Sequence, residues 1–474
     1  MGRLYPLVIG GALAAPEQEL TVCSPYDGGE AGRCGDATGL EVERALEAAA
    51  GARAAMAALP AWKRAQALGE LETAVRTNQD ELVRLMVAEA GKPVKAAQVE
   101  VRRALLTLRT AAEEALRIGG AVEPLDVAAG GEGRWAISRR FPVGVIAGIT
   151  PFNFPLNLVL HKLAPAIASG NPIIIKASPR APLCALRVGE MALGLELPPG
   201  AVNVLSGGAE PALRLCEDGR VAMVSFTGSA AVGWKLKARA AHKKVVLELG
   251  GNAANVVHSD ADLDLAAERL VAGAFSYAGQ SCISVQRVLA QQDVYAALRT
   301  RLLERIRRLR VGDPRDPETD VGPMINAEAA ARAFAWMQDA VAAGAAAACG
   351  MKQDGALVWP TVLENVPPDA AIWKEEAFAP VLLLRSYQRF EEALEESNAS
   401  RYGLQAGVFT RDINLAWRAF EVLEVGAVAL NEVSSWRMDP MPYGGVKASG
   451  FGREGLRSSM EEMTELRLLL LRAS

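Results

Sequence analysis

Histidine and cysteine are both scarce in this chain. The 474 residues include three histidines, all far apart in the sequence, so there is no local zinc signature and we expect no metal site. The six cysteines form no Cys-x-x-Cys pair, and six in a chain of this length do not make a disulfide framework. We therefore expect free thiols and a reducing, cytoplasmic environment.

Long apolar runs and an excess of charge are also missing. No run of about 18 uninterrupted apolar residues is present, so we expect no membrane span. The first residues carry one basic side chain and no long apolar run, so we expect no secretory leader. The formal net charge of −4 provides no electrostatic footprint for nucleic acid. The composition, 50% hydrophobic and 22% charged, is globular, and the length predicts two or three domains.

Segments typical of helices come first, and segments typical of buried strands follow. Residues 41–118 are rich in alanine, leucine, glutamate and arginine, with apolar positions recurring every three or four residues, which predicts helices. A glycine-rich break at 128–133 precedes 134–140, which alternates like a strand with one solvent-facing side. Five short apolar runs then alternate with helical stretches, at 143–149, 172–175, 202–205, 222–226 and 244–247. This pattern is typical of a doubly wound parallel sheet, so we expect an α/β fold.

A second alternation of strands and helices runs through residues 250–450. Its clearest strands are expected at 285–290, 381–384 and 427–430, and the alanine-rich stretch 341–349 predicts the end of a tightly packed helix. The tail, 464–471, is apolar and typical of a strand, and such a strand needs a partner. Pairing across a subunit interface and docking within the chain are both open from the sequence.

A candidate phosphate-binding turn follows one of the apolar runs. The residues Phe-Thr-Gly-Ser at 226–229 stand before a predicted helix start, where backbone N–H groups can bind a phosphate. They match neither Gly-x-Gly-x-x-Gly nor a Walker A motif, and an ordinary helix start explains them about as well. Upstream, Lys176 ends a buried apolar run, and ligands bind at the carboxyl ends of such strands.

Three separate segments carry residues suited to nucleophilic catalysis. Asn153 lies in Pro-Phe-Asn-Phe-Pro, where its amide either stabilises an oxyanion or forms an Asx turn. Cys282, in Gly-Gln-Ser-Cys, is either a nucleophile with a nearby base or a small buried side chain. Glu248 stands 34 residues before it in Leu-Glu-Leu-Gly-Gly-Asn. Burial there would raise the carboxyl pKa toward neutrality, and a structural ion pair is the alternative.

Together these motifs resemble those of the aldehyde dehydrogenase superfamily. Seven motifs, too many for a chance similarity, occur in the order of that family over nearly the whole chain: Asn153 with its neighbours, Lys176, 226–229, Glu248 with its neighbours, Cys282, 375–380 and 442–447. Within the family, the segment 441–465 is similar to that of lactaldehyde, succinate-semialdehyde and non-phosphorylating glyceraldehyde-3-phosphate dehydrogenases.

The resemblance implies a fold of three parts. A Rossmann-like cofactor-binding domain is expected from residues 1–120 and 141–248, and a catalytic α/β domain from residues 249–446. A small β hairpin for oligomerisation would take residues 121–140, and the C-terminal strand would lie in 447–474. Family members are usually dimers or tetramers, so we expect a homodimer or a homotetramer.

The resemblance also implies roles in the oxidation of an aldehyde to its acid. Cys282 would attack the aldehyde, and Asn153 would stabilise the oxyanion. After hydride transfer to NAD or NADP, Glu248 would activate water to hydrolyse the thioester. Lys162 and Glu454 match positions proposed for a proton relay. The alternative chemistry transfers the acyl group to coenzyme A, and enzymes of that kind generally lack the glutamate, so its presence favours hydrolysis.

For the cofactor, the resemblance implies a larger group of residues. Lys176 and Glu376 would hold the two riboses, and Phe378 would lie beside the nicotinamide ring. The whole expected set is Thr150, Pro151, Phe152, Lys176, Ser178, Pro179, Gly228, Ser229, Leu249, Glu376 and Phe378.

Two cofactor positions depart from the family pattern. Ala379 replaces a family glycine, which matters only if that position needs a positive φ. Pro179 stands where many NAD-preferring members carry an acidic residue. Without that carboxylate a 2′-phosphate meets no like charge, and Arg180 could attract it, so use of both NAD and NADP is expected.

The substrate is the part that the sequence determines least. Members with a similar C-terminal segment act on short aldehydes, several of them anionic. Arg437 lies in the loop where such enzymes contact the far end of the substrate, and its guanidinium suits a carboxylate, phosphate or sulfonate. A structural salt bridge is the alternative role for Arg437. Phe154 and Tyr443 are the other residues expected to contact the substrate.

Overall fold

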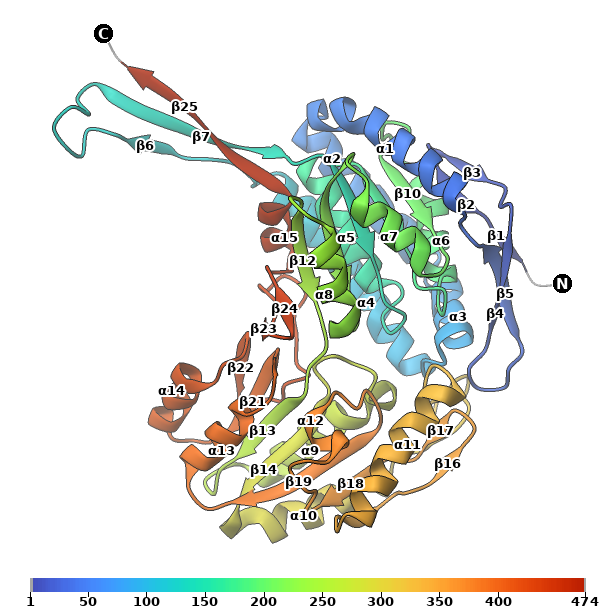
Figure 1. The fold of residues 1–474 in the computed structure, drawn as a ribbon, viewed down its shortest axis with the longest axis vertical. Coiled ribbons are helices and arrows are strands. Elements are labelled where there is room, and N and C mark those ends of the chain that lie inside the picture. Colours follow the sequence, from blue (N-terminus) through green and yellow to red (C-terminus); the bar gives the residue numbers. More distant parts are fainter. Residues whose placement is uncertain (1–2, 473–474) are drawn as a thin grey trace.

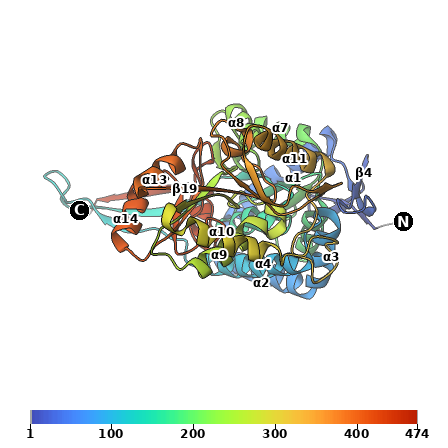
Figure 2. The ribbon, with the colours of Figure 1, turned by 90° about the horizontal axis from the view of Figure 1, so that it is seen from below.

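The chain folds into two α/β bodies and a projecting β arm (Figure 1), in a computed structural model that describes residues 3–472. The first body is mostly blue and green in Figure 1, and the second is yellow and orange. The arm carries the C-terminal end of the chain away from both, and Figure 2 shows that it extends on the side opposite the N-terminal end. The α/β fold that the sequence predicts is confirmed.

Eight strands form the sheet of the first body, in the order β24-β12-β11-β8-β9-β10-β2-β3. The five central strands are parallel and almost wholly apolar, as strands buried on both faces are. They are the five that the sequence predicts: β8 (Val145–Ile149), β9 (Ile173–Lys176), β10 (Val202–Leu205), β11 (Val221–Thr227) and β12 (Lys244–Glu248). The outer strands pair antiparallel, and they are β2 (Leu7–Ile9), β3 (Ala12–Ala14) and β24 (Gly450–Phe451).

Helices cover this sheet in layers. The predicted helical segment 41–118 is broken into four helices at three places. Pro60 stands at the N-cap of α2, Asn78 is both the C-cap of α2 and the N-cap of α3, and Gly91, with a φ of 62°, ends α3 before Pro93 at the N-cap of α4. α5 and α6 contact the sheet, α2, α3 and α4 pack on them, and α1 and α7 contact the sheet and each other. The bounds are α1 (Gly39–Ala58), α2 (Ala61–Thr77), α3 (Gln79–Ala90), α4 (Val94–Ala115), α5 (Asn157–Ser169), α6 (Leu183–Ala192), α7 (Ala209–Glu217), α8 (Ala230–Arg239) and α15 (Leu456–Glu462).

The parallel register brings several predicted site residues to one edge of the sheet. Ile149 at the end of β8 pairs with Lys176 at the end of β9. Thr227 at the end of β11 pairs with Glu248 at the end of β12, and β8 and β11 are themselves neighbours. The loops that follow these four strands therefore leave the sheet side by side, at the carboxyl edge where doubly wound sheets bind ligands.

Seven strands form the sheet of the second body, in the order β15-β18-β19-β14-β13-β21-β22. All but the first run parallel: β13 (Ala253–Val257), β14 (Val285–Gln291), β18 (Thr361–Glu364), β19 (Val381–Tyr387), β21 (Gln405–Phe409) and β22 (Ala427–Leu430). The helices around it are α9 (Leu263–Phe275), η1 (Ser276–Gly279), α10 (Gln292–Ile306), α11 (Ala327–Ala342), α12 (Ala371–Lys374), α13 (Phe390–Asn398) and α14 (Ile413–Val422).

The alanine-rich stretch 341–349 is the segment whose prediction is wrong. Helix α11 ends at Ala342, and residues 346–349 instead form β15 (Ala346–Cys349), an edge strand antiparallel to β18. Gly344, with a φ of 106°, makes the turn between helix and strand. Alanine favours a helix, but here pairing with β18 outweighs that weak local preference.

The projecting arm is a three-stranded antiparallel sheet in the order β25-β7-β6. It consists of β6 (Val122–Pro124), β7 (Arg134–Pro142) and β25 (Thr464–Arg472). The C-terminal strand pairs with β7 of its own chain along its whole length, which is one of the two pairings that the sequence leaves open. Residues 450–462, grouped with the arm in the sequence analysis, instead form β24 and α15 and belong with the first body.

Three small sheets complete the fold: β1 (Leu4–Tyr5), β5 (Glu30–Gly35) and β4 (Glu19–Cys23); β16 (Gln353–Asp354) and β17 (Leu357–Val358); β20 (Tyr402–Gly403) and β23 (Val446–Lys447). All six cysteines are free thiols. In the part of the chain from 3 to 472, no helix combines the length and the apolar character needed to cross a membrane.

Candidate active site

A cavity of about 270 Å³ lies where the carboxyl edge of the first sheet faces the second body. Fourteen of the residues predicted from the sequence line it: Pro151, Phe152, Asn153, Phe154, Gly228, Ser229, Glu248, Leu249, Cys282, Glu376, Phe378, Arg437, Tyr443 and Glu454. Five predicted residues do not line it: Thr150, Lys162, Lys176, Ser178 and Pro179.

Cys282 lies on the loop between η1 and β14. Tyr277 and Ala278 in η1 have positive φ values of 50° and 53°, a conformation that is rare for residues other than glycine, so the chain approaching Cys282 is strained. The Cys282 Sγ lies 3.1 Å from the Tyr443 hydroxyl oxygen. Burial raises the pKa of the Cys282 thiol to about 12, so the neutral thiol is favoured in this arrangement.

Asn153 reaches from the first body to the Cys282 loop. Its Nδ2 donates a hydrogen bond to the Gln280 carbonyl at 3.0 Å, and its buried Oδ1 has no partner among the described residues. Gln280 is fixed in turn, because its Oε1 accepts from the Ile325 N–H at 2.8 Å. One short loop therefore sets both the position of the thiol and that of the Asn153 amide.

Glu248 and Glu454 are two buried carboxyl groups with opposite pKa shifts. Burial and then the negative charge of Glu454 raise the pKa of Glu248 well above its ordinary value, and neither Glu248 oxygen has a hydrogen-bond partner within residues 3–472. Burial opposes ionisation of Glu454 too, but the Lys162 ammonium and neighbouring cations outweigh it and lower its pKa to about 2. The two groups therefore ionise over different pH ranges: Glu454 is ionised, whereas Glu248 binds a proton more readily.

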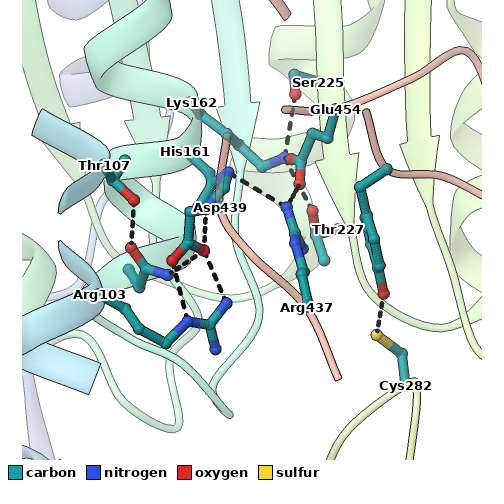
Figure 3. A network of polar contacts seen from close by, with 12 residues as sticks. Arg103, Thr107, His161, Lys162, Ser225, Thr227, Cys282, Arg437, Asp439 and Glu454 are labelled. Atoms are coloured by element: carbon teal, nitrogen blue, oxygen red, sulfur yellow. Dashed lines mark hydrogen bonds and ion pairs between the residues drawn. The ribbon is translucent and has the colours of Figure 1, made fainter. Parts of the chain in front are cut away.

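Lys162 lies behind the cavity wall and supports Glu454. Its Nζ, completely buried on α5, donates to Glu454 Oε1 at 2.8 Å, to Thr227 Oγ1 at 2.8 Å and to Ser225 Oγ at 3.0 Å (Figure 3). These contacts satisfy all three ammonium protons. The two residues predicted as a proton relay therefore meet directly, although 292 positions separate them in the chain.

Arg437 lies against the cavity with only 7% of its side chain exposed. Its Cζ lies 3.7 Å from the centre of the Tyr443 ring, a cation–π contact. Its Nη2 is 3.4 Å from His161 Nδ1 and 3.7 Å from Glu454 Oε2, and its Nε has no partner among the described residues. Arg437 therefore makes no closed, bidentate salt bridge, and a buried guanidinium with an unpaired N–H is suited to an anionic ligand.

Asp439 holds the side chains beside Arg437 and was not predicted from the sequence. It accepts from Arg103 Nη2 at 2.7 Å and Nε at 3.1 Å, from Asn157 Nδ2 at 3.0 Å, and contacts His161 Nε2 at 2.8 Å (Figure 3). Burial opposes its ionisation, but hydrogen bonds from His161 and Arg103 hold its pKa well below the usual range. Because His161 Nε2 donates to the carboxylate, Nδ1 is left to accept from Arg437.

The missed residues had only weak signals in the sequence. His161 directly precedes Lys162, and Asp439 stands two positions after Arg437. Arg103 lies in a helical stretch where a charged residue is typical of a solvated face. Nothing in the spacing indicates that these three meet, since their contact depends on how α4, α5 and the loop before β23 pack together.

The predicted cofactor residues outside the cavity lie at the ends of β8 and β9. The Thr150 N–H donates to the Lys176 carbonyl at 3.1 Å, and Ser178 and Pro179 follow on the partly exposed loop. Burial lowers the pKa of the Lys176 ammonium to about 8. These residues form a strip that continues from the cavity along the carboxyl edge of the first sheet.

Phe378, and not Ala379, takes the left-handed backbone conformation, with a φ of 49°. The alanine at 379, where the family has glycine, therefore does not occupy a position of positive φ. The Phe378 ring meets Phe152 edge to face, with centroids 5.9 Å apart, so the strained residue is held from both bodies.

Three features of this strip fit a dinucleotide. Helix α8 starts after Gly228-Ser229 with no side-chain cap, so its first N–H groups are open to a phosphate. The Glu376 carboxylate accepts from the Gly251 N–H at 3.0 Å, and a Cβ on Gly250 would come within 2.2 Å of it. The buried Lys176 ammonium makes no hydrogen bond to another residue of 3–472, which leaves its donors for hydroxyls or phosphate.

A buried ion pair stabilises the two loops of the site. Lys92 pairs with Glu100, and its Nζ lies 3.8 Å from the Phe154 ring centre and 4.4 Å from that of Tyr277. Glu100 Oε1 accepts from the N–H groups of Leu156 and Asn157, each at 3.0 Å, at the start of α5. One pair thus joins the Asn153 loop to the segment before Cys282.

Replacing Lys92 with methionine is expected to lower the free energy of unfolding by about 3–5 kcal/mol, because it leaves the buried Glu100 carboxylate without the cation that balances its charge. Denaturant unfolding measures the change. The control is Lys95→Met, three residues on, which removes an exposed pair with Asp320 and should cost no more than about 1 kcal/mol. Equal losses in the two variants would show that the buried pair has no special contribution.

The comparisons with known proteins agree with this geometry. The model of the aldehyde dehydrogenase family matches residues 13–469. A 3-sulfolactaldehyde dehydrogenase of Priestia aryabhattai is 40% identical over 470 residues, which are 99% of this chain and 98% of that protein.

Two solved structures extend the comparison to the fold. Aldehyde dehydrogenase 21 of Physcomitrella patens, solved with the reaction product succinate, is 40% identical with a TM-score of 0.98 and covers 100% of this chain and 99% of its own. A glyceraldehyde-3-phosphate dehydrogenase of Methanocaldococcus jannaschii, solved with NADP, is 37% identical with a TM-score of 0.93 and covers 96% of this chain and 100% of its own. Sequence, fold and cavity agree, and the chain belongs to the aldehyde dehydrogenase family.

Proposed function

We propose that this protein oxidises a short, anionic aldehyde to its carboxylic acid through a thioester on Cys282, with NAD or NADP as the hydride acceptor. The observation that carries the proposal is the meeting of four groups in one cavity: the Cys282 thiol, the Asn153 amide, the Glu248 carboxyl of raised pKa and the buried Arg437 guanidinium. Nucleophile, oxyanion donor, base and anion site are what this reaction needs.

The first step is addition of the Cys282 thiolate to the aldehyde carbon. A carbon–sulfur bond forms and the carbonyl π electrons move to oxygen, which gives a thiohemiacetal oxyanion. Asn153 Nδ2 carries a second N–H besides the one bonded to Gln280, and this N–H together with the Cys282 backbone N–H would stabilise the oxyanion. A dinucleotide held beside Cys282 would supply the hydride acceptor, and loss of hydride from the same carbon would turn the adduct into a thioester.

Glu248 then acts as the general base for hydrolysis. Its carboxylate takes a proton from water, the hydroxide adds to the thioester carbon, and the carbon–sulfur bond breaks to release the acid and the thiolate. A raised pKa makes Glu248 a stronger base than an exposed glutamate. Glu454 and Lys162, joined at 2.8 Å, would pass the proton away from the cavity.

The strip beyond the cavity would hold the cofactor. We assign the pyrophosphate to the start of α8 at Gly228 and Ser229, and the two riboses to Lys176 and Glu376. Thr150, Pro151, Phe152, Ser178, Leu249 and Phe378 complete this assignment. Pro179 offers no carboxylate to repel a 2′-phosphate, and the exposed Arg180 beside it favours one, which supports use of NADP as well as NAD.

An anionic substrate is favoured by the chemistry of the far end of the cavity. Arg437 has an unpaired N–H there, and Arg103 lines the same wall with its guanidinium held by Asp439. The similar proteins described above are named for, or solved with, a sulfonate, a carboxylate and a phosphate compound. A guanidinium binds all three groups, so we assign Arg437 to the substrate anion, with Phe154 and Tyr443 as further substrate contacts.

Replacing Arg437 with methionine should separate anionic from neutral aldehydes. We expect kcat/KM for succinate semialdehyde to fall ~100-fold, the loss of a charge-assisted contact worth about 3 kcal/mol, and kcat/KM for uncharged butanal to fall at least about tenfold less. We expect the same difference between two further aldehydes: kcat/KM should fall much more for anionic 3-sulfolactaldehyde than for uncharged lactaldehyde. Initial rates of reduced-nicotinamide formation, measured with NAD and with NADP, give these values.

A control for this experiment is Arg299→Met, which removes a guanidinium paired with Glu364 on the second sheet, away from the cavity. Its kcat/KM should stay at the wild-type value for every aldehyde. Equal losses for charged and neutral aldehydes in the Arg437 variant would contradict an anion site. A wild-type enzyme that oxidises no aldehyde of the panel would contradict the proposed function itself.

We propose a homo-oligomer, either a dimer or a tetramer, because the arm presents an apolar surface. Leu466, Leu468, Leu469 and Leu470 on β25 are each more than half exposed, and β25 is an edge strand of its sheet. Exposed leucines on an unpaired edge favour association with another copy of the chain.

A further inference from the structure

Tyr443 is held rigidly next to the proposed nucleophile. It is 3% exposed, and its backbone exchanges two hydrogen bonds with Glu454, at 2.9 Å from its N–H and 2.7 Å to its carbonyl. This bridge fixes the tyrosine backbone to the same residue that Lys162 anchors. The side chain therefore cannot move far without disturbing the proposed proton relay.

The hydroxyl of Tyr443 points to the sulfur of Cys282. The two atoms lie 3.1 Å apart, and Figure 3 marks the contact with a dashed line to Cys282. Among residues 3–472 this is the one hydrogen bond that the hydroxyl makes. A neutral thiol can donate to the phenol oxygen, whereas a thiolate can only accept, so ionisation of Cys282 would make Tyr443 the donor.

Arg437 strengthens this donor. Its guanidinium lies 3.7 Å from the centre of the Tyr443 ring, and a cation against the π face withdraws electron density from the hydroxyl. Burial raises the pKa of Tyr443 well above its ordinary value, so the phenol keeps its proton throughout the working pH range. The site thus contains a neutral hydroxyl, polarised from one side and directed at the sulfur.

We propose that Tyr443 is a catalytic residue whose hydroxyl donates a hydrogen bond to the Cys282 thiolate and so raises the fraction of Cys282 that is ionised. This inference rests on the assignment of Cys282 as nucleophile. The proposed function treats Tyr443 as a substrate contact. The inference gives it a further role, toward the reacting sulfur. It also gives Arg437 a second role, through the ring on which it lies.

The charges around the sulfur show why a neutral donor is needed. Burial raises the pKa of the thiol most, the carboxyl groups of Glu376 and Glu248 raise it further, and Arg437 lowers it. The Tyr443 hydrogen bond also lowers it, without adding a charge that the cavity would have to stabilise.

The protons and electrons balance without any further reactant. When Cys282 ionises, its proton leaves to a base or to water, and Tyr443 turns its own proton toward the sulfur without losing it. When the sulfur adds to the aldehyde, its electron pair forms the new bond and the negative charge moves to the substrate oxygen. The Tyr443 hydrogen bond then weakens and re-forms when hydrolysis returns the thiolate.

The test is Tyr443→Phe, which removes one oxygen and keeps the ring under Arg437. Iodoacetamide is added over a range of pH, and the rate of alkylation is followed on the Cys282 peptide by mass spectrometry. We expect the pKa of Cys282 to rise by about one to two units and alkylation near neutral pH to slow by about 10- to 100-fold, as loss of a hydrogen bond to a charged group implies. The control is Tyr387→Phe, a buried tyrosine on β19 of the second body whose hydroxyl donates to the Val257 carbonyl, and its alkylation profile should match that of the wild type.

Two results would overturn the inference, and they have different consequences for the proposed function. If the pKa of Cys282 is the same in the Tyr443 variant as in the wild type, the tyrosine has no role toward the sulfur and the proposed function stands. If alkylation of Cys282 in the wild type leaves the rate of aldehyde oxidation unchanged, the nucleophile assignment and this inference both fail. Far-ultraviolet circular dichroism and the melting temperature of each variant separate these outcomes from misfolding.

Discussion

Replacing Glu248 with glutamine is expected to leave one rapid turnover of hydride transfer per active site and to slow every later turnover by about 100-fold or more. Glutamine keeps the size of the side chain but cannot take a proton from water, so the thioester on Cys282 forms and is not hydrolysed. Stopped-flow absorbance of the reduced nicotinamide should therefore show a burst close to one equivalent, followed by an almost flat phase.

The pH dependence gives this prediction a sign. A general base must be deprotonated to act. The wild-type steady-state rate should therefore rise as the pH rises through the raised pKa of Glu248, and the rate of the Glu248→Gln variant should not show this rise.

The control is Glu364→Gln, a buried carboxyl on the second sheet outside the cavity, which should show no burst phase of its own. If the Glu248→Gln variant turned over at the wild-type rate, Glu248 would have no part in the mechanism. Turnover by the wild type that needs coenzyme A and yields no free acid would favour the acyl-transfer alternative.

Replacing Cys282 with serine should have the larger effect, a loss of kcat by about 10⁴-fold or more, since removing a nucleophile abolishes covalent catalysis. The serine hydroxyl is similar in size but is ionised far less readily than a thiol, so neither the adduct nor the thioester forms at a useful rate. Both the burst and the steady state should disappear.

The matched control for Cys282 is Cys23→Ser, because Cys23 is an exposed free thiol on β4 of the first body. That variant should retain wild-type kcat and the wild-type burst. If the Cys282 variant kept a tenth of the activity, catalysis would have to proceed without a covalent intermediate on this residue.

The sheets were predictable because buried parallel strands have a simple signature. The run at 172–175 is apolar without interruption, and the run at 202–205 is interrupted only by Asn203. They form β9 and β10, whose two faces are covered by helices. The α-helical stretch 41–118 was equally clear, and two of its three breaks fall at a glycine or a proline, whose backbone preferences are local; the third falls at Asn78. Such features depend on neighbours in the sequence and not on the rest of the fold.

The segments that were predicted wrongly or left open depend on distant partners. Residues 346–349 carry only alanine and one cysteine, and their strand exists because β18 lies beside them. The partner of β25 could not be chosen from its own sequence, because an apolar strand pairs equally well within a chain or between chains.

The residues of the candidate site also divide into those with a local signal in the sequence and those whose contacts depend on distant partners. Cys282, Glu248 and Asn153 were predicted because each lies in a distinctive motif. Glu248 and Asn153 lie at the carboxyl edge of the first sheet, and Cys282, on the loop before β14 of the second body, lines the same cavity. Arg103 and Asp439 are unremarkable in sequence, and 336 positions separate them, so their bidentate contact became visible only in the folded chain.

The most direct measurement is the mass of the enzyme caught between the two half-reactions. The Glu248→Gln variant is mixed with succinate semialdehyde and NADP, quenched in acid, and analysed intact and after digestion. The account predicts one acyl group per chain, located on the peptide that contains Cys282, in an amount equal to the hydride burst. An acyl group on another residue, or a full burst with no covalent adduct, would contradict a thioester on Cys282.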